Sequence, residues 1–183
     1  MPTKSELRKR VKAHLSALTT EEKREMSVKA SIGCIFQPFF EGARSLFVFC
    51  STADEPSTRP LITAALQKGK KVYLPRIEGG MMVCVPYREG EDFALNEYGI
   101  LEPTAEAAPC SEALSVDIAI VPLLAFDKDK HRLGRGKGYY DRFLSAFKGV
   151  KVGYAFSVQE CDDVPTEAHD VALDYIVTEK DVF

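Results

Sequence analysis

Apolar residues recur every three or four positions in the N-terminal part of the chain, whereas after Gly42 they gather in short continuous runs. The first pattern is typical of an amphipathic helix, and the second of a buried parallel strand. The periodic part predicts two helices, over residues 4–18 and 20–37. The apolar positions of the first helix form one thin stripe, which predicts a helix on the surface of the domain. This stripe consists of Leu7, Val11, Leu15 and Leu18.

Both helices begin with the same capping signal. A threonine precedes the first helical residue, and a glutamate follows it three positions later. In such a capping box the two side chains satisfy backbone N–H groups that a helix start leaves unpaired. The two pairs are Thr3 with Glu6 and Thr19 with Glu22.

The apolar runs after Gly42 predict five strands with helices between them. Helices are predicted over residues 56–69 and 139–147. Strands that alternate with helices predict an α/β fold, with an open and mostly parallel sheet that helices flank. In such sheets ligands bind beyond the carboxyl ends of the strands. The predicted strands are residues 45–50, 71–75, 117–122, 150–156 and 173–178.

Residues 78–115 fit this alternation less well. The run MMVCVPY, residues 81–87, predicts an additional strand. The stretch that follows mixes turn residues, acids and alanines, so residues 88–115 are expected to form an ordered excursion from the sheet.

The composition predicts a cytosolic protein with one domain over residues 1–183. An apolar fraction of 45% is ordinary for a globular chain of this length. The five cysteines are widely spaced and include no CxxC pair, which indicates free thiols in place of disulfides or a zinc site. No apolar run approaches the roughly 20 residues needed to cross a bilayer, so no membrane partner is expected. A monomer is expected.

The net charge of −3 hides an uneven distribution. Residues 128–148 carry seven Lys or Arg against two Asp, whereas residues 159–183 carry eight Asp or Glu against one Lys. If the two segments meet, they would focus an anionic ligand beside carboxylates that hold a divalent cation. Two separate solvated surfaces are the alternative.

The stretch RLGRGKGYYD, residues 132–141, places glycines at alternate positions with cations between them. Glycine lets the backbone approach a ligand closely, and the helix that follows presents free N–H groups to an anion. Arg132, Arg135 and Lys137 add positive charge, so the stretch predicts a phosphate site. A solvated turn before a helix is the alternative.

This stretch matches neither common nucleotide-binding pattern. A P-loop has Ser or Thr after its lysine, and here Gly138 follows Lys137. A dinucleotide fold needs GxGxxG early in a βαβ unit, with an acid about 20 residues further on. We therefore exclude both patterns.

Four charged residues outside the glycines have a functional and a structural interpretation. Asp141 would bring Mg²⁺ to a triphosphate, or would complement the dipole of the helix that it opens. Lys4 and Arg8 share one helix face, and would either close a cationic cage over the glycines or stay solvated. Glu55 comes just after the first predicted strand, and it would be either a carboxylate of the site or a residue that starts the next helix.

No catalytic triad is predicted. The three histidines, His14, His131 and His169, have no nucleophile at an interpretable spacing. The lack of a triad favours a reaction that the protein promotes by positioning phosphates and a metal.

The stretch PLLAFDKDKHRLGRGKGYYDRFL, residues 122–144, closely resembles the signature of the 5-formyltetrahydrofolate cyclo-ligase family, also called methenyltetrahydrofolate synthetase. Three further segments resemble that family: Lys4 with Arg8, Glu55 with Thr58, and the closing stretch DVALDYIVTE, residues 170–179. The resemblance implies an α/β fold shared with sugar-phosphate isomerases and CoA transferases. It also implies ATP- and Mg²⁺-dependent closure of 5-formyltetrahydrofolate to 5,10-methenyltetrahydrofolate, with release of ADP and phosphate.

The resemblance also implies roles for individual residues. The implied ATP contacts are Lys4, Arg8, Arg132, Leu133, Gly134, Arg135, Gly136, Lys137, Gly138, Tyr139 and Tyr140. The implied folate contacts are Arg8, Cys50, Glu55, Arg135, Gly136, Lys137, Gly138 and Tyr139. The loop borders both ligands, which makes Arg135, Lys137 and Tyr139 the candidate catalytic residues. The implied magnesium carboxylates are Asp141 and Asp170, with Asp163 and Asp174 as alternatives to Asp170.

One position departs from the family pattern. Lys130 stands where the family usually has a glycine, so the turn either holds a lysine at some strain or takes a different shape.

Two other functions remain open from the sequence. One is a related enzyme that acts on another formylated or phosphorylated substrate. The other is a nucleic-acid-binding protein, which the acidic net charge and the confinement of the basic residues to one loop disfavour, so no nucleic-acid partner is expected.

Overall fold

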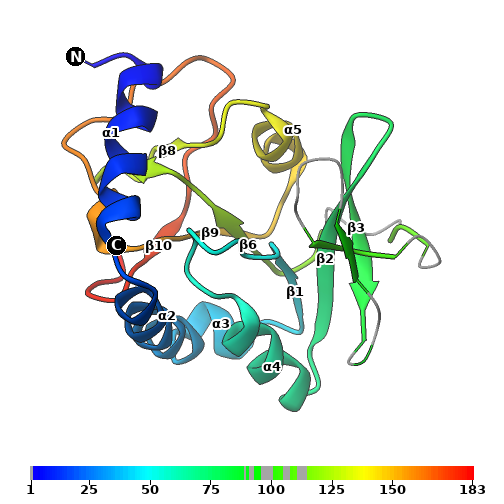
Figure 1. Ribbon diagram of the computed structural model, residues 1–183. Helices are drawn as coiled ribbons and strands as arrows, with labels where there is room; N and C mark the ends of the chain where they lie inside the picture. The colour runs from blue at the N-terminus through cyan, green and yellow to red at the C-terminus, as the bar shows by residue number, and fades with distance from the viewer. Residues whose placement is uncertain (1, 89, 91–92, 96–100, 105–107, 111–114) are drawn as a thin grey trace.

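A six-stranded sheet forms the centre of the protein (Figure 1). The structure is a computed structural model, and it describes all residues except 1, 89, 91–92, 96–100, 105–107 and 111–114. All strands of the sheet run parallel except β3, which pairs antiparallel with β2. The strand order is β10 (Tyr175–Val177), β9 (Val150–Tyr154), β6 (Ile118–Pro122), β1 (Ser45–Val48), β2 (Lys71–Glu78) and β3 (Met81–Tyr87). The predicted α/β class and all five predicted parallel strands are confirmed.

Side chains of the central strands alternate between two apolar layers because successive residues of a strand point to opposite faces. Leu46 and Val48 of β1 face one layer, and Phe47 between them faces the other. On β6, Ile118 and Ile120 likewise oppose Ala119 and Val121. Both faces are buried, so the strands read as continuous apolar runs in the sequence.

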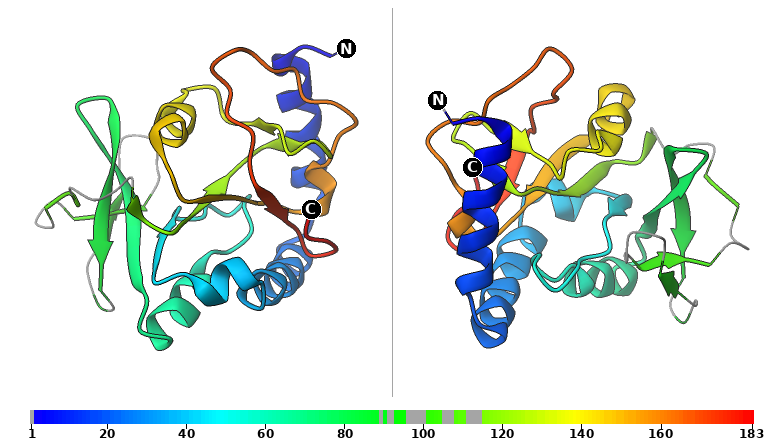
Figure 2. Two further views of the ribbon diagram at one scale, coloured as in Figure 1. Left: turned by 180° about the vertical axis from the view of Figure 1, so that it is seen from behind. Right: turned by 45° about the horizontal axis from the view of Figure 1, so that its top comes forward.

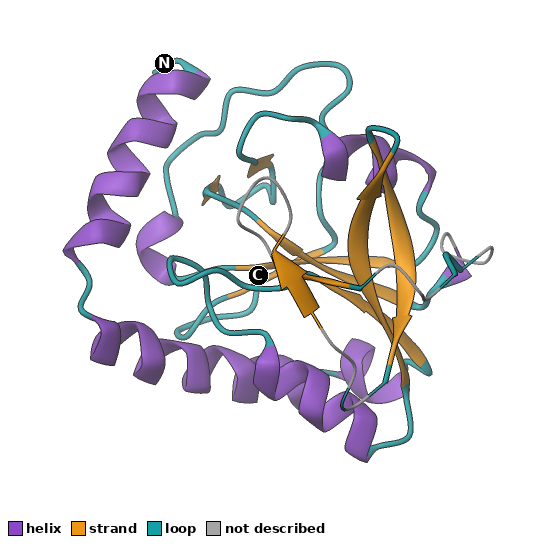
Figure 3. Cartoon of the chain, turned by 45° about the vertical axis from the view of Figure 1, so that its right-hand side comes forward, coloured by secondary structure: helices purple, strands orange, loops and turns teal. Residues whose placement is uncertain are grey.

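Helices cover both faces of the sheet. In Figure 3, α2 (Thr20–Ile35), α3 (Pro38–Gly42) and α4 (Arg59–Gln67) lie along one face. They bury residues such as Cys34, Phe40 and Leu61 against it. On the opposite face, α5 (Tyr139–Ala146) packs Phe143 and Leu144 against the sheet.

Helix α1 (Lys4–Ala17) stands apart from these layers and packs against the segments that carry the glycine loop. Figure 2 shows it beside η2 (Ser157–Gln159), with β7 (Ala125–Phe126) and β8 (Arg132–Leu133) nearby. Its stripe of Leu7, Val11 and Leu15 is buried in a third apolar cluster with residues of these segments. Both predicted capping boxes are present, at the starts of α1 and α2.

The structure differs from the predicted elements mainly in short segments. The predicted strand over residues 81–87 is β3, and β4 (Phe93–Leu95) pairs with β5 (Leu101–Pro103) in the predicted excursion. The rest of that excursion includes residues that lie outside the described part of the chain. The sequence did not predict α3, β4, β5, β7, β8 or η2. Among the described helices, none is long and apolar enough to cross a membrane.

Candidate active site

A cavity of about 370 Å³ opens where β1 and β6 end. Phe49 and Cys50, which follow β1, and Pro122, the last residue of β6, line it. This is the position at which open α/β sheets bind ligands. The cavity is also lined by every residue that we assigned to the site from the sequence: Lys4, Arg8, Cys50, Glu55, residues 132–141 and Asp170.

The glycine loop passes from β8 to α5 along the wall of this cavity. Gly136 has a φ of 102°, and Gly138, the N-cap of α5, has a φ of 68°. Both angles belong to conformations that L-residues with side chains rarely adopt. A Cβ atom at Gly136 would lie 3.3 Å from Nη2 of Arg8, so the glycine also lets this arginine approach the backbone. The loop thus leads into the N-terminus of α5, where backbone N–H groups can bind an anion.

Helix α1 brings two cations to the same wall. Nε of Arg8 donates a hydrogen bond to the carbonyl oxygen of Gly134 at 3.0 Å. Nζ of Lys4 lies 2.6 Å from Oδ2 of Asp170 and 3.1 Å from Oε1 of Glu167. Arg8 therefore docks on the glycine loop, which the cage interpretation requires, whereas Lys4 docks on the acidic C-terminal segment.

The basic and acidic segments meet at this point. The backbone N–H of Leu173 also donates to the carbonyl oxygen of Lys130 at 3.0 Å. Burial acts to lower the pKa of Lys4, but the hydrogen bonds and charges of Asp170 and Glu167 outweigh it and raise that pKa. Burial acts to raise the pKa of Asp170, and the hydrogen bonds from Lys4 and from the Glu167 backbone lower it below its ordinary value. Both side chains of the pair are therefore charged at neutral pH.

Arg132 is the buried cation of the site. Its Nη2 lies 2.6 Å from Oδ1 of Asp141, and its guanidinium stands over the Tyr140 ring, 5.6 Å from the centroid. The Nε atom is buried and has no hydrogen-bond partner within the described part of the chain. Asp141 lies in the first turn of α5, as predicted, and also neutralises Arg132. Burial raises the pKa of Tyr140 well above its usual value, with the charges of Glu55 and Cys50 acting in the same direction, so its hydroxyl stays protonated.

Arg135 crosses from the glycine loop to the segment after β1. Its Nη2 lies 2.7 Å from Oε1 of Glu55 and 3.2 Å from Oγ1 of Thr52. The backbone N–H of Thr52 donates to the other Glu55 oxygen at 2.9 Å. No acid lies in the first turn of α4, so Glu55 is a cavity carboxylate and not a helix-start residue.

One part of the cavity is apolar, and the sequence did not predict its lining. It is formed by Phe49, Pro75, Ile77 and Met82, together with the thiol of Cys50. Burial, followed by the charges of Glu102 and Glu55, raises the pKa of Cys50 to about 12. The thiol is therefore neutral at physiological pH, which makes it a packing group and not a nucleophile.

Comparison with known proteins bears directly on this cavity. The model of the 5-formyltetrahydrofolate cyclo-ligase family matches residues 1–179. The chain is 34% identical to 5-formyltetrahydrofolate cyclo-ligase of Escherichia coli K12 over 173 residues, which cover 91% of this chain and 95% of that protein. The mouse protein of the same name is 32% identical over 187 residues, covering 94% and 92% of the two chains.

The chain belongs to the 5-formyltetrahydrofolate cyclo-ligase family.

Solved structures agree with this assignment. The structure is similar to that of 5,10-methenyltetrahydrofolate synthetase from Aquifex aeolicus, with a TM-score of 0.86, 37% identity, and coverage of 98% of this chain and 91% of the other. It also has the fold of the Mycoplasma pneumoniae synthetase, with a TM-score of 0.79 at 23% identity, covering 98% of this chain and 100% of the other. The resemblance drawn from residues 122–144 is thereby confirmed, and ATP is the co-substrate of the family.

Lys130, where the chain departs from the usual cyclo-ligase pattern, has a left-handed backbone conformation. Among the described residues other than glycine, Lys130 alone has a positive φ, of 66°. Its N–H donates to the Asp127 carbonyl at 3.0 Å, which closes the turn. The turn thus holds a lysine in a conformation that costs an L-residue about 1–2 kcal/mol. The first of the two expected alternatives is correct.

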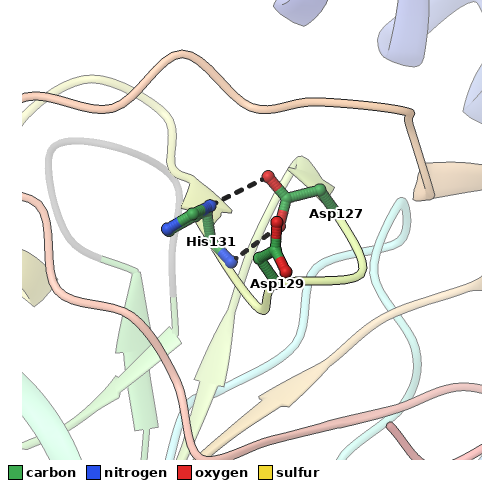
Figure 4. A group of neighbouring side chains, drawn as sticks. All are labelled: Asp127, Asp129 and His131. Carbon is green, nitrogen blue, oxygen red and sulfur yellow. Dashed lines mark hydrogen bonds and ion pairs between the residues drawn. The ribbon is translucent and has the colours of Figure 1, made fainter.

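Asp127, Asp129 and His131 gather in the same turn (Figure 4). Their possible metal-ligating atoms lie within 4.8 Å of one another. Asp127, however, is buried and already saturated. Its Oδ1 accepts the N–H of His131 at 3.0 Å, and its Oδ2 accepts the N–H of Val164 at 3.0 Å and lies 3.0 Å from Nδ1 of His131. This carboxylate therefore holds together the turn that precedes the glycine loop.

Proposed function

We propose that this protein converts 5-formyltetrahydrofolate to 5,10-methenyltetrahydrofolate, with ATP cleaved to ADP and phosphate. The observation that carries the proposal is the division of one cavity into two parts. The glycine loop and the cations of α1 form one part, and an apolar pocket with carboxylates forms the other. Arg135 contacts both parts, because it leaves the loop and reaches Glu55. A phosphate donor and an apolar formylated ring can thus meet in one enclosure.

ATP would bind along the glycine loop. Lys4, Arg8 and residues 132–140 supply the contacts in this proposal. The N–H groups at the start of α5 and the charges of Arg135 and Lys137 suit the triphosphate, because charge-assisted hydrogen bonds are the stronger ones.

The folate would bind in the other part, against Cys50 and Glu55, with Arg8 and residues 135–139 at the border. The apolar residues beyond Cys50 suit the ring system, since sites for such ligands are mostly apolar with a few placed polar groups. Glu55 is held for this purpose by Thr52 and Arg135.

The reaction requires activation of the formyl oxygen, which is a poor leaving group. That oxygen attacks the γ-phosphorus of ATP, the bond to the bridging oxygen breaks, and ADP leaves. N10 of the folate then attacks the activated carbon, phosphate leaves with the former formyl oxygen, and the N10 proton passes to solvent. Such a transfer depends on placement and charge neutralisation more than on a protein nucleophile. Arg135, Lys137 and Tyr139 are the proposed catalytic residues because they border both ligands.

The cavity also suits Mg²⁺. Asp141 and Asp170 are carboxylates at its wall, and hard oxygen ligands of this kind, with phosphate oxygens, are what Mg²⁺ prefers. In the structure each acid contacts a cation, Asp141 with Arg132 and Asp170 with Lys4, and a bound ion would share these carboxylates with the two cations. When bound, the ion would neutralise charge on the phosphates. The choice of Asp170 over Asp163 or Asp174 is supported by its place in the cavity lining, which those two residues do not share.

The test is absorbance at the band of the methenyl product. Purified protein is mixed with 5-formyltetrahydrofolate, ATP and Mg²⁺, and control mixtures lack ATP or the metal. The band should grow only in the complete mixture. A flat trace from folded protein that binds ATP would contradict the proposed substrate. The cytoplasmic location and the monomeric state expected from the sequence stay predictions.

A further inference from the structure

Arg142, on α5, contacts three successive residues of the glycine loop. Its Nη1 donates a hydrogen bond to the carbonyl oxygen of Lys137 at 3.3 Å. Its guanidinium carbon stands over the Tyr139 ring, 5.1 Å from the centroid. A Cβ atom at Gly138 would lie only 3.1 Å from Nη1, so the glycine leaves room for this contact. The arginine side chain thus folds back over the start of its own helix.

Arg142 has no role in the reaction scheme and no direct place in the site. Lys137, Gly138 and Tyr139 line the cavity, whereas Arg142 is not among the described residues that line it. Its side chain is exposed. It can therefore act on a bound ligand only through the loop residues that it holds, or through its charge.

The hydrogen bond to Lys137 fixes the direction of one peptide group of the loop. In a planar trans peptide the carbonyl oxygen and the N–H point in opposite directions. Because Arg142 binds the Lys137 carbonyl, the N–H of Gly138 in the same peptide points away from Arg142. That N–H forms no hydrogen bond with the described part of the chain. It is therefore available to a phosphate oxygen, as N–H groups at a helix start are.

We propose that Arg142 is a positioning residue for the phosphate loop. Its bond to the Lys137 carbonyl orients the Gly138 N–H toward a phosphate of ATP. Its contact with Tyr139 fixes the ring of a proposed catalytic residue, since a cation is attracted to the face of an aromatic ring. The inference rests on the proposed function, which supplies the phosphate that the loop binds.

The first test measures the dissociation constant of ATP with Mg²⁺ by calorimetric titration of the full chain. Arg142→Ala should raise this constant about 10-fold, the loss expected when one hydrogen bond to a charged group is not formed. The KM for 5-formyltetrahydrofolate should stay within about twofold, and the melting temperature should hardly change because the side chain is exposed. Arg59→Ala, which removes an exposed arginine at the start of α4, is the matched control and should change none of these quantities. An ATP affinity of the Arg142 variant equal to that of wild type would overturn the inference.

The second test separates positioning from charge. Arg142→Lys keeps the charge, but a single ammonium group can bind the carbonyl or stand over the ring and cannot do both. Its dissociation constant for ATP should lie between those of wild type and Arg142→Ala. Full recovery by lysine would show that the charge alone acts, and would overturn the positioning role. Wild type that binds ATP without forming the methenyl product would instead contradict the proposed substrate, and the ATP measurements on Arg142 would still decide the inference.

Discussion

The ammonium group of Lys4 lies 2.6 Å from Oδ2 of Asp170, so the first helix is joined to a segment 166 residues further along the chain. The contact closes one side of the cavity, because both residues line it. It explains how two segments of opposite charge, which the sequence shows separately, become parts of one site.

The stability of this contact should depend on pH. The pKa of Asp170 is lowered from its ordinary value of 3.8, so its contribution is fully present above that value and is lost as the pH falls through the lowered pKa. Asp170→Asn should lower the free energy of unfolding by about 1 kcal/mol at pH 7. Denaturant unfolding of both proteins between neutral and acidic pH should show this difference shrinking toward zero. A difference independent of pH would contradict the assignment of an ion pair.

Removal of the Lys137 ammonium should impair catalysis without affecting the fold. Lys137 is exposed on the glycine loop at the cavity wall. Lys137→Ala should lower kcat/KM by about 100-fold or more, because charge on the transferred phosphoryl group loses a stabilising cation. Its free energy of unfolding should stay within about 0.5 kcal/mol of wild type. Lys148→Ala, an exposed lysine that follows α5, is the control, and near-normal turnover of the Lys137 variant would refute the assigned role.

Asp141 should have a double effect, because it neutralises Arg132 and is a proposed metal ligand. Asp141→Asn should lower the free energy of unfolding by about 1–3 kcal/mol, since buried Arg132 then lacks its charged partner. Magnesium titrations of turnover should show a higher half-saturating concentration. Asp129→Asn, in the neighbouring acidic turn, should change neither quantity. An unchanged magnesium response in the Asp141 variant would count against the metal role.

The strained turn at Lys130 offers a test of the backbone argument. Lys130→Gly should raise the free energy of unfolding by up to about 1 kcal/mol, because glycine relieves the left-handed strain but adds freedom to the unfolded chain. Lys128→Gly, two positions earlier and without a positive φ, should lower it by about 0.4–1 kcal/mol. Denaturant unfolding of both variants measures the contrast. Equal destabilisation by the two substitutions would show that Lys130 carries no strain.

Much of the fold could be predicted because its signals are local. A strand buried on both faces must be apolar along its whole length, so β6 is visible in the sequence as a single run. The capping boxes are visible because they need only two residues at a fixed spacing. By contrast, β7 and β8 have two residues each, too few to show any periodicity.

The candidate site could be predicted where one loop carries the chemistry, and not where the fold brings separate strands together. Residues 132–141 are contiguous, so their charges and glycines stand out. Glu102 and Ile77 meet only because β5 lies against β2, which no spacing in the sequence reveals. Arg132 was expected among the phosphate contacts, but no spacing in the sequence reveals that it is buried and paired with Asp141.

The most direct measurement of the central claim follows the formyl oxygen. 5-Formyltetrahydrofolate labelled with ¹⁸O in the formyl group is turned over with ATP and Mg²⁺ in unlabelled water, and the released phosphate is analysed by mass spectrometry. Transfer of the γ-phosphoryl group to that oxygen predicts one ¹⁸O atom in each phosphate, in step with the methenyl product. Unlabelled phosphate formed at the same rate as the product would contradict the account, because ATP would then be cleaved without activating the formyl group.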